Sequence, residues 1–395
     1  MPESSVRDAK EQQDNMPNFF PDESERQRLF PVCKSKIFLG HAAVTALPAC
    51  VADAMCAHVR QSCEMPQEFG DVLRDIKNAR RLCAEFIGAE QDEIALLGPT
   101  SLGLSLFANG LPWQPGDEVI CYAGDYPANV YPWIDLRRRG VIVKLLQPAR
   151  PGEITPDIVA AALTPKTRLV ALASCHFFSG YRIDVDAIGK LLHSRGVLFS
   201  LDAIQTLGAF PLSVEHVDFL SADAHKWMLG PVAIGIVYVK RKHFDLCRPT
   251  LLGAWNVYSP NFQAQDEVRF VPTAQRYEPG VLNIAGIYGM QTAIAMFLRH
   301  GTQKIATRIL ELTAHLTAGL RERGYEIHSP VAAASASGIT TFRREGRSMA
   351  ELHAKLESAG VVSSLRHDRE GRDYLRFSPH FYNTEAELDT SLGLL

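Results

Sequence analysis

Asp202 is the first of several residues whose type and position could do chemistry. It directly follows the apolar run 197–201, and Gln205 comes three residues later. A carboxylate at the end of a strand often only caps the next helix. It could instead pair with a protonated ring nitrogen of a cofactor, and Gln205 could then reach an adjacent ring oxygen. The segment by itself leaves both interpretations open.

A second segment places Lys226 between His225 and Trp227, shortly before the Gly230-Pro231 pair. A solvated surface lysine beside a turn is the simpler interpretation. An apolar neighbourhood, however, favours the neutral amine, and a neutral amine can form a Schiff base with an aldehyde. Asp202, twenty-four residues upstream, strengthens this second interpretation.

The third segment is a turn of small residues at 98–103, where Thr100 and Ser101 open a helical pattern. Backbone N–H groups and hydroxyls at a helix N-terminus can bind a phosphate. The same residues could serve only as helix caps. A phosphate loop, a strand-end acid and a downstream lysine together nevertheless predict a pyridoxal phosphate (PLP) site better than any one of them does.

These three segments occur in the order found in class V aminotransferases. The chain resembles this family, which includes cysteine desulfurases, kynureninase and isopenicillin N epimerase. The resemblance extends from FLGHAA at 38–43 to RFSPHFYNT at 376–384. It implies a fold-type I architecture with pyridoxal 5'-phosphate as cofactor.

The resemblance also implies roles for the residues near the cofactor ring. Lys226 would hold the cofactor as a Schiff base and then shuttle the α-proton of the substrate. Asp202 would keep the pyridine nitrogen protonated, so that the ring can withdraw electrons from Cα. Gln205 matches the position that binds the phenolic oxygen, and Tyr126 matches the aromatic residue stacked on the cofactor.

Further matches concern the phosphate, the substrate and a second subunit. The resemblance implies that His225, Thr100 and Ser101 bind the phosphate. Arg376 would grip the substrate carboxylate, for which a planar guanidinium is well suited. His41 and Ala42, with Ala43, would line the substrate mouth. Trp255 and Asn256 would lie near the cofactor of a neighbouring subunit in a homodimer with shared active sites.

Three departures from the family pattern limit what can be carried over. Asp223 stands where many relatives have a phosphate-binding serine, so we expect its carboxylate to point away or to orient His225. Phe177 replaces an asparagine near the cofactor ring. The last of the eight cysteines is Cys247, and segment 361–374, where desulfurases carry the persulfide-forming thiol, contains none. The sequence therefore argues against a housekeeping cysteine desulfurase.

The reaction type stays open at this point. The leading expectation is a PLP-dependent enzyme acting on an α-amino acid by transamination or a related lyase reaction. Epimerisation or racemisation is the alternative, since the destination of one proton decides among them. A catalytically silent scaffold is disfavoured because Lys226, Asp202 and Arg376 are all present. A nicotinamide-dependent dehydrogenase is disfavoured because no GxGxxG turn follows a first strand.

The elements that must position these residues follow an alternating pattern. Short apolar runs at 118–122, 169–173, 197–201, 217–220 and 233–239 predict strands, with helices at 71–87 and 185–195. A helical tract at 285–323 and a region of two strands and one helix follow. We expect a doubly wound, mainly parallel α/β domain and a smaller C-terminal α+β domain. The predicted divisions are a polar arm at 1–30, a large domain at 31–285 and a small domain at 286–395.

Composition excludes several other classes of protein. The 395 residues contain 41 Lys and Arg against 44 Asp and Glu, which argues against a nucleic-acid partner. With 46% hydrophobic residues the chain can bury a large core. No run approaches the length of a membrane span, and the charged N-terminus has no signal-like apolar stretch, so we expect a cytoplasmic protein. The cysteines lack zinc-type spacing, so we expect no metal site and reduced thiols.

Overall fold

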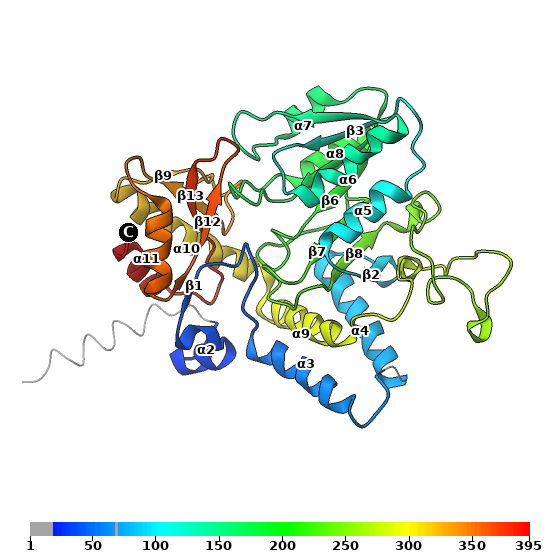
Figure 1. The fold of residues 1–395 in the computed structure, drawn as a ribbon, viewed down its shortest axis with the longest axis horizontal. Helices are drawn as coiled ribbons and strands as arrows, with labels where there is room; N and C mark the ends of the chain where they lie inside the picture. Colours follow the sequence, from blue (N-terminus) through cyan, green and yellow to red (C-terminus); the bar gives the residue numbers. More distant parts are fainter. Residues whose placement is uncertain (1–18, 68–69) are drawn as a thin grey trace, which may run out of the picture.

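A seven-stranded sheet forms the centre of the computed structural model, which describes residues 19–67 and 70–395 (Figure 1). The strand order is β2-β8-β7-β6-β5-β3-β4. Strand β8 pairs antiparallel with both of its neighbours, β7 and β2, so it runs opposite to the other six strands of the sheet. The bounds are β2 (Ile94–Leu96), β3 (Glu118–Tyr122), β4 (Ile142–Leu146), β5 (Thr167–Ala173), β6 (Leu198–Asp202), β7 (Phe219–Asp223) and β8 (Gly235–Val239).

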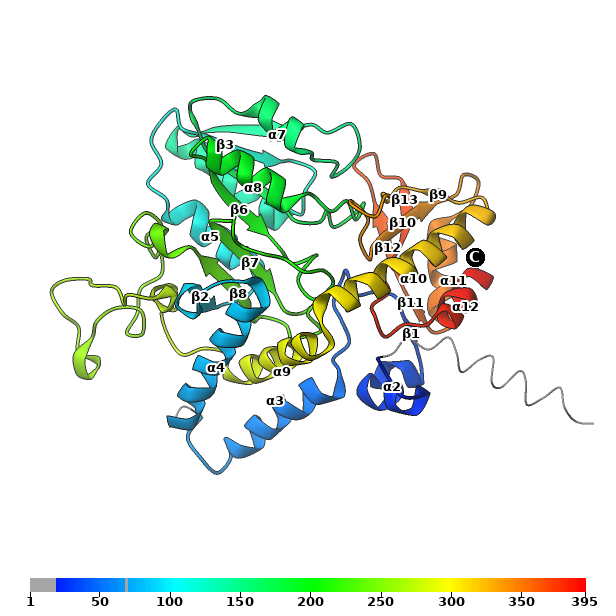
Figure 2. The same ribbon diagram turned by 180° about the vertical axis from the view of Figure 1, so that it is seen from behind.

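Helices cover both faces of this sheet, as Figures 1 and 2 show from opposite sides. Alternation along the strands explains this: Val170 and Leu172 enter one buried cluster, whereas Leu169 and Ala171 enter another. The first cluster includes residues of α4 (Gly70–Ile87), α8 (Val185–Ser194) and α9 (Ile284–His300). The second includes residues of α5 (Thr100–Gly110) and α6 (Tyr131–Asp135). The predicted doubly wound, mainly parallel fold is confirmed.

The C-terminal part is a four-stranded antiparallel sheet with helices packed around a separate buried cluster. Its strand order is β12-β13-β10-β9. The bounds are β9 (Glu326–Ile327), β10 (Thr340–Arg343), β12 (Ser364–His367) and β13 (Asp373–Phe377), with helices α10 (Thr302–Glu322), α11 (Met349–Ser358) and α12 (Glu385–Gly393). This part is richer than the two strands and one helix predicted, because short strands give little periodicity in the sequence.

The predicted helical tract at 285–323 is in fact two helices, α9 and α10. They are separated at Gly301, whose φ of 84° lies in the left-handed region. A glycine adopts that conformation at little cost, so the chain can change direction there.

The N-terminal residues that the structure describes pack against the C-terminal part. Helix α2 (Glu23–Leu29) places the buried Arg26 3.0 Å from Glu387, and the Phe30 ring stacks on Tyr382. Strand β1 (Ile37–Phe38) pairs with β11 (Val361–Val362), while α3 (Ala49–Gln61) packs on α9. Contacts therefore cross both predicted domain boundaries, at 30 and at 285, and residues 1–18 of the predicted arm lie outside the described residues.

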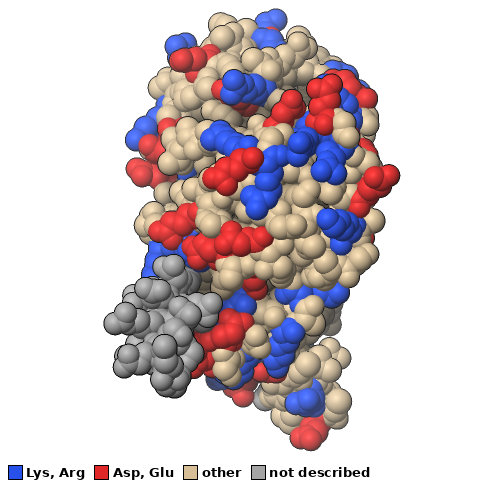
Figure 3. All heavy atoms as spheres, turned by 90° about the vertical axis from the view of Figure 1, so that its left-hand side faces the viewer, with Lys and Arg blue, Asp and Glu red and all other residues tan. Residues whose placement is uncertain are grey.

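Short 3-10 helices complete the secondary structure. They are η1 (Pro31–Lys34), η2 (Gln91–Glu93), η3 (Pro127–Asn129), η4 (Leu136–Arg139), η5 (Arg241–His243), η6 (Pro260–Phe262) and η7 (Ala274–Tyr277), and α7 (Pro156–Ala162) is a two-turn α-helix. On the face that carries the C-terminal elements, acidic and basic side chains are interspersed (Figure 3). Within the described ranges, no helix has the length and apolarity needed to cross a bilayer.

Candidate active site

The predicted site residues converge on one pocket of about 330 Å³ beside the carboxyl ends of β6 and β7. Ligands bind at this edge in open α/β sheets. Nine of the ten predicted residues line it: Ala42, Thr100, Ser101, Tyr126, Asp202, Gln205, His225, Lys226 and Arg376. Residues separated by more than three hundred positions thus meet in a single cavity.

Lys226 is the lysine that lines this pocket. Its side chain is buried, and its Nζ lies 5.4 Å from the centre of the Tyr126 ring. In the described part of the chain, Nζ has neither a hydrogen bond nor an ion pair. Burial lowers the pKa of Lys226 to about 8, although the charge of Asp202 opposes the shift. A substantial share of this amine is therefore neutral near physiological pH, as a nucleophile requires.

Asp202 occupies the last position of β6 and is buried. Its Oδ1 accepts a hydrogen bond of 3.1 Å from the N–H of Ile204, and its Oδ2 accepts none from a described residue. Burial raises the pKa of Asp202 to about 6. Strand β6 is followed by turns at residues 204–209 and then by β7, so Asp202 is not a helix cap. Its free Oδ2 can accept a hydrogen bond from a protonated ring nitrogen.

Gln205 is held on both sides of its amide. Its Nε2 donates to the carbonyl of Ala42 over 3.1 Å, and its Oε1 accepts from Trp227 Nε1 over 2.8 Å. One hydrogen on Nε2 remains for a ligand oxygen. These bonds also tie segment 42–44 to the lysine loop, which fixes one wall of the pocket.

The N-terminus of α5 forms the opposite end of the pocket. This helix packs tightly on β7: a Cβ added at Gly103 would lie 2.5 Å from Ser221 Oγ. Thr100 and Ser101 begin the helix, and Thr100 Oγ1 accepts a 2.8 Å hydrogen bond from the N–H of Asp223. The Thr100 hydroxyl proton and the N–H groups of Thr100 and Ser101 remain available to an anion, whereas the N–H of Leu102 donates to the Pro99 carbonyl.

His225 and Asp223 interact at this same end. His225 Nδ1 lies 3.1 Å from Asp223 Oδ1, and the Asp223 carboxylate is almost fully buried. The carboxylate thus lies close to the imidazole, although the two groups do not form a hydrogen bond. His225 lines the pocket.

Tyr126 is half exposed and forms one face of the pocket together with Phe177. The two rings meet edge to face, with centroids 5.5 Å apart. The buried Asp125 carboxylate accepts hydrogen bonds from the N–H of Tyr126 and the side chain of Asn129, which fixes the Tyr126 loop. Burial, and secondarily the charge of Asp202, raises the pKa of Asp125 to about 7.

Two arginines enter the pocket from the C-terminal sheet. Arg376, on β13, is almost fully buried, and its Nη1 donates a 2.5 Å hydrogen bond to the carbonyl of Phe177. Its Nε and Nη2 are buried without a partner. Arg366, on β12, lines the same pocket. Burial, and secondarily the charge of Arg366, lowers the pKa of Arg376 to about 9.

The structure does not bring His41 into the pocket lining, contrary to the prediction. The His41 ring is fully buried, with Nδ1 2.8 Å from the Ser378 carbonyl and Nε2 2.7 Å from the Tyr382 hydroxyl. Both ring nitrogens are therefore used in joining the N-terminal segment to the C-terminal part. Asn256 is likewise buried and holds its own loop, bonding to Gly253 N and to the carbonyls of Leu251 and Arg276.

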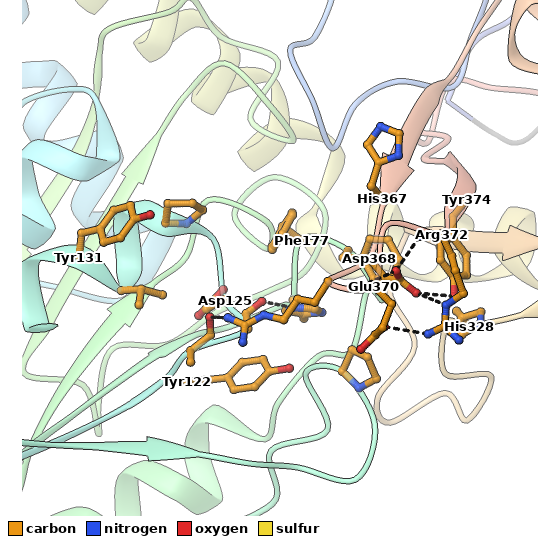
Figure 4. A pocket seen from close by; sticks show the side chains of 18 of the residues that line it. Tyr122, Asp125, Tyr131, Phe177, His328, His367, Asp368, Glu370, Arg372 and Tyr374 are labelled. Atoms are coloured by element: carbon orange, nitrogen blue, oxygen red, sulfur yellow. Dashed lines mark hydrogen bonds and ion pairs between the residues drawn. The ribbon is translucent and has the colours of Figure 1, made fainter. Parts of the chain in front are cut away.

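A larger cleft of about 550 Å³ adjoins the pocket and shares Phe177 with it. In Figure 4, Tyr122, Asp125 and Tyr131 of the large domain lie across this cleft from Asp368, Arg372 and Tyr374 of the C-terminal part. Arg369 bridges the two sides by donating to the carbonyl of Ala123. The cleft is lined mostly by aromatic and apolar side chains, and Lys226 does not line it.

Sequence reasoning missed Arg366 and Asp125. Arg366 stands in the charged run RHDREGR at 366–372, which has the composition of a solvated hairpin. Residues two apart in a strand share one face, and the residue two positions before Arg366 in β12 pairs with Arg376. This alternation was the signal that could have placed Arg366 on the same face of the sheet as Arg376. Asp125 gave no signal beyond its position after a strand.

These observations fit pyridoxal phosphate. The pocket offers an unpartnered buried amine, a carboxylate with one free oxygen that could pair with a ring nitrogen, an aromatic side chain, and a helix N-terminus with a histidine that could hold the phosphate. Fold and site together define a PLP-dependent enzyme of fold type I.

Comparison with known proteins identifies the family. The profile described as "Aminotransferase class-V" matches residues 37–390. A protein of Methanothermobacter thermautotrophicus named "Probable cysteine desulfurase" is 28% identical, with 92% of this chain and 94% of that protein covered. The Bacillus subtilis protein "Uncharacterized aminotransferase YcbU" is 24% identical, with 92% of this chain and 94% of that protein covered. The chain belongs to the class V aminotransferase family.

Solved structures support the fold. The apo cysteine desulfurase of Thermococcus onnurineus superimposes with a TM-score of 0.88 at 23% identity, covering 95% of this chain and 97% of the other. The cystine C-S lyase C-DES, in complex with cysteine persulfide, superimposes with a TM-score of 0.83 at 21% identity, covering 92% of this chain and 98% of the other. At these identities the likeness establishes the architecture.

Proposed function

We propose that this protein is a PLP-dependent lyase that removes a sulfur-linked β-substituent from an α-amino acid. The observation that supports this most is that Lys226 and Arg376 line the same pocket, while Nε and Nη2 of Arg376 have no hydrogen-bond partner among the described residues. That arrangement suits a substrate held by its α-carboxylate with Cα near the lysine. The names of the relatives, cysteine desulfurase and cystine C-S lyase, support C–S cleavage over transamination or epimerisation.

In this proposal Arg376 and Lys226 have separate roles. Arg376 holds the α-carboxylate through two parallel hydrogen bonds. Lys226 takes the proton from Cα, and the bound cofactor supplies the electron sink that makes this proton acidic. The Cβ–S bond then breaks, and the sulfur leaves with the electron pair. With one water consumed, the products are a thiol or persulfide, a 2-oxo acid and ammonium.

Sulfur in this proposal leaves as a small molecule instead of passing to a protein thiol. No cysteine lines the pocket, and segment 361–374 contains none. Cys175 follows β5 but is fully buried, and burial raises the pKa of its thiol to about 11. A thiol that stays protonated is a poor nucleophile.

The decisive test begins with borohydride reduction of the PLP-loaded protein and peptide mapping. We expect the pyridoxyl adduct on Lys226, none in Lys226→Met, and the full adduct in the control Lys190→Met, whose exposed lysine pairs with Asp186. Incubation should then yield 2-oxo acid and ammonium, together with sulfide from cysteine and free thiol from its thioethers. A 2-oxo acid that keeps its sulfur would indicate transamination, and a persulfide on Cys175 lost in Cys175→Ser would contradict the proposal.

We also propose that two copies of the chain form a dimer with the active sites at its interface. We further propose that the protein is located in the cytoplasm. Apolar side chains are exposed beside the pocket and on the projecting segment 250–272 (Figure 1): Val44, Tyr126, Leu251, Leu252 and Phe262. An exposed apolar surface of this kind is typical of an interaction site. All eight cysteines are unpaired, which suits a reducing compartment. Light scattering should give the mass of a dimer, with Phe262→Asp shifting it toward a monomer, and cell fractionation tests the location.

A further inference from the structure

Arg366 is a second arginine of the active pocket, and its positive charge has no partner. In residues 19–67 and 70–395 it makes no hydrogen bond and no ion pair. Arg366 is only partly buried and lines the pocket, so its two Nη groups are open to a ligand there. Its buried Nε lacks an acceptor, and a buried donor without a partner is costly, so the group points to an anion that satisfies it.

The α-carboxylate of the substrate does not need Arg366. Arg376 keeps Nη1 on the Phe177 carbonyl and leaves Nε and Nη2 without partners. These two nitrogens form one edge of the guanidinium, and that edge matches both oxygens of a carboxylate. A single carboxylate is therefore satisfied by Arg376, and the donors of Arg366 remain.

The register of the C-terminal sheet puts the two guanidinium groups side by side. Arg366 lies opposite Tyr374, and Arg376 is two residues further along the same strand, so the arginines are diagonal neighbours on one face. Diagonal neighbours in a sheet have Cα atoms roughly 7–8 Å apart, and like charges so placed repel. An anion beside each arginine removes that repulsion.

The other charged groups around the pocket do not supply this anion. Asp202 lies at the end of β6, and the Asp223 carboxylate faces His225 at the phosphate end. Lys226 adds a further positive charge, and no other acidic residue lines the pocket. The C-terminal wall thus has two cationic groups for one α-carboxylate.

We infer that Arg366 binds a second anionic group, carried on the side chain of the substrate, and so selects amino acids whose sulfur substituent ends in a carboxylate or similar oxyanion. This inference rests on the proposed lyase function. It makes Arg366 a specificity-determining residue separate from Arg376, and it predicts discrimination by charge at the far end of the substrate.

A matched pair of substrates tests the inference. S-carboxymethyl-L-cysteine and S-carbamoylmethyl-L-cysteine have nearly the same size and differ in the charge of the terminal group. Binding is followed by visible absorption of the PLP-loaded protein, and turnover by thiol release. Wild type should prefer the carboxymethyl compound by roughly tenfold or more in both Kd and kcat/KM, the scale of a charged contact in a partly buried site.

The variant Arg366→Gln should abolish that preference, because it should weaken binding and turnover of the carboxymethyl compound by roughly tenfold more than those of the carbamoylmethyl compound. Arg369→Gln removes one positive charge from the same hairpin outside the pocket, and it should keep the preference. Equal binding of both compounds to wild type, or an equal loss for both in Arg366→Gln, would overturn the inference and leave the lyase function standing. If neither compound nor cysteine altered the spectrum of wild type, the proposed function itself would fail.

Discussion

Arg376, which lines the pocket, donates a hydrogen bond of 2.5 Å from Nη1 to the carbonyl oxygen of Phe177, and its Nε and Nη2 stay buried without a partner. The backbone of Phe177 thus aims the arginine. Because the fork geometry matters as much as the charge, Arg376→Lys should lower kcat/KM substantially, although the charge is conserved. Arg376→Ala should cost about 2–5 kcal/mol in transition-state binding.

An amine without a carboxylate is the control for Arg376. It should react poorly and at similar rates with wild type and with Arg376→Ala, because neither protein can use the missing contact. Equal impairment of carboxylate-bearing and carboxylate-free amines would show that Arg376 only supports the structure.

Asp202→Asn should nearly abolish turnover and retain the cofactor. The amide keeps the hydrogen bond to Ile204 N but removes the charge that stabilises a protonated ring nitrogen. The phosphate-binding groups, at the N-terminus of α5, are untouched. Steady-state rates and cofactor content by absorbance check this, and near-normal turnover would leave Asp202 only the structural role of holding the turn at Ile204.

Asp223→Ala should weaken cofactor binding. His225 loses the carboxylate that lies 3.1 Å from its Nδ1, so the ring no longer has a fixed orientation toward the phosphate end. Equilibrium dialysis of PLP against the cofactor-free protein measures the effect. Tighter binding in the variant would mean that repulsion between the Asp223 carboxylate and the phosphate is the dominant effect.

Lys226→Met should stabilise the cofactor-free protein. The pKa of Lys226 falls from 10.5 to about 8 on folding, so the unfolded chain binds more protons between these values. The resulting destabilisation is fully present below pH 8 and disappears as the pH rises toward 10.5. Methionine removes it, which should add about 1–3 kcal/mol to the free energy of unfolding at pH 7.

Urea unfolding of the cofactor-free protein at pH 7 and pH 10 checks this sign. The gain should shrink at the higher pH, and the exposed Lys190→Met should show no comparable gain at either pH. Destabilisation by Lys226→Met at pH 7 would show that the ammonium is well solvated in the folded protein.

The sequence by itself predicted five of the seven strands of the sheet and, through the family resemblance, the candidate cofactor residues; β2 and β4 were not predicted. Strand β3 has the predicted bounds, and Asp202 and Lys226 follow strands whose apolar runs are visible in the sequence. Such features depend on local periodicity and short spacing, and parallel strands bring their carboxyl ends to one edge whatever their order. The cofactor residues were therefore accessible before any tertiary contact was known.

Only the tertiary structure decided the substrate end. The free edge of Arg376 depends on the Phe177 carbonyl, 199 residues away in the chain, and the unpaired charge of Arg366 depends on the register of β12 against β13. His41 was assigned to the pocket by its sequence neighbours, yet its contacts with Ser378 and Tyr382 bury it. Contacts between distant segments follow from packing and register, which local patterns do not encode.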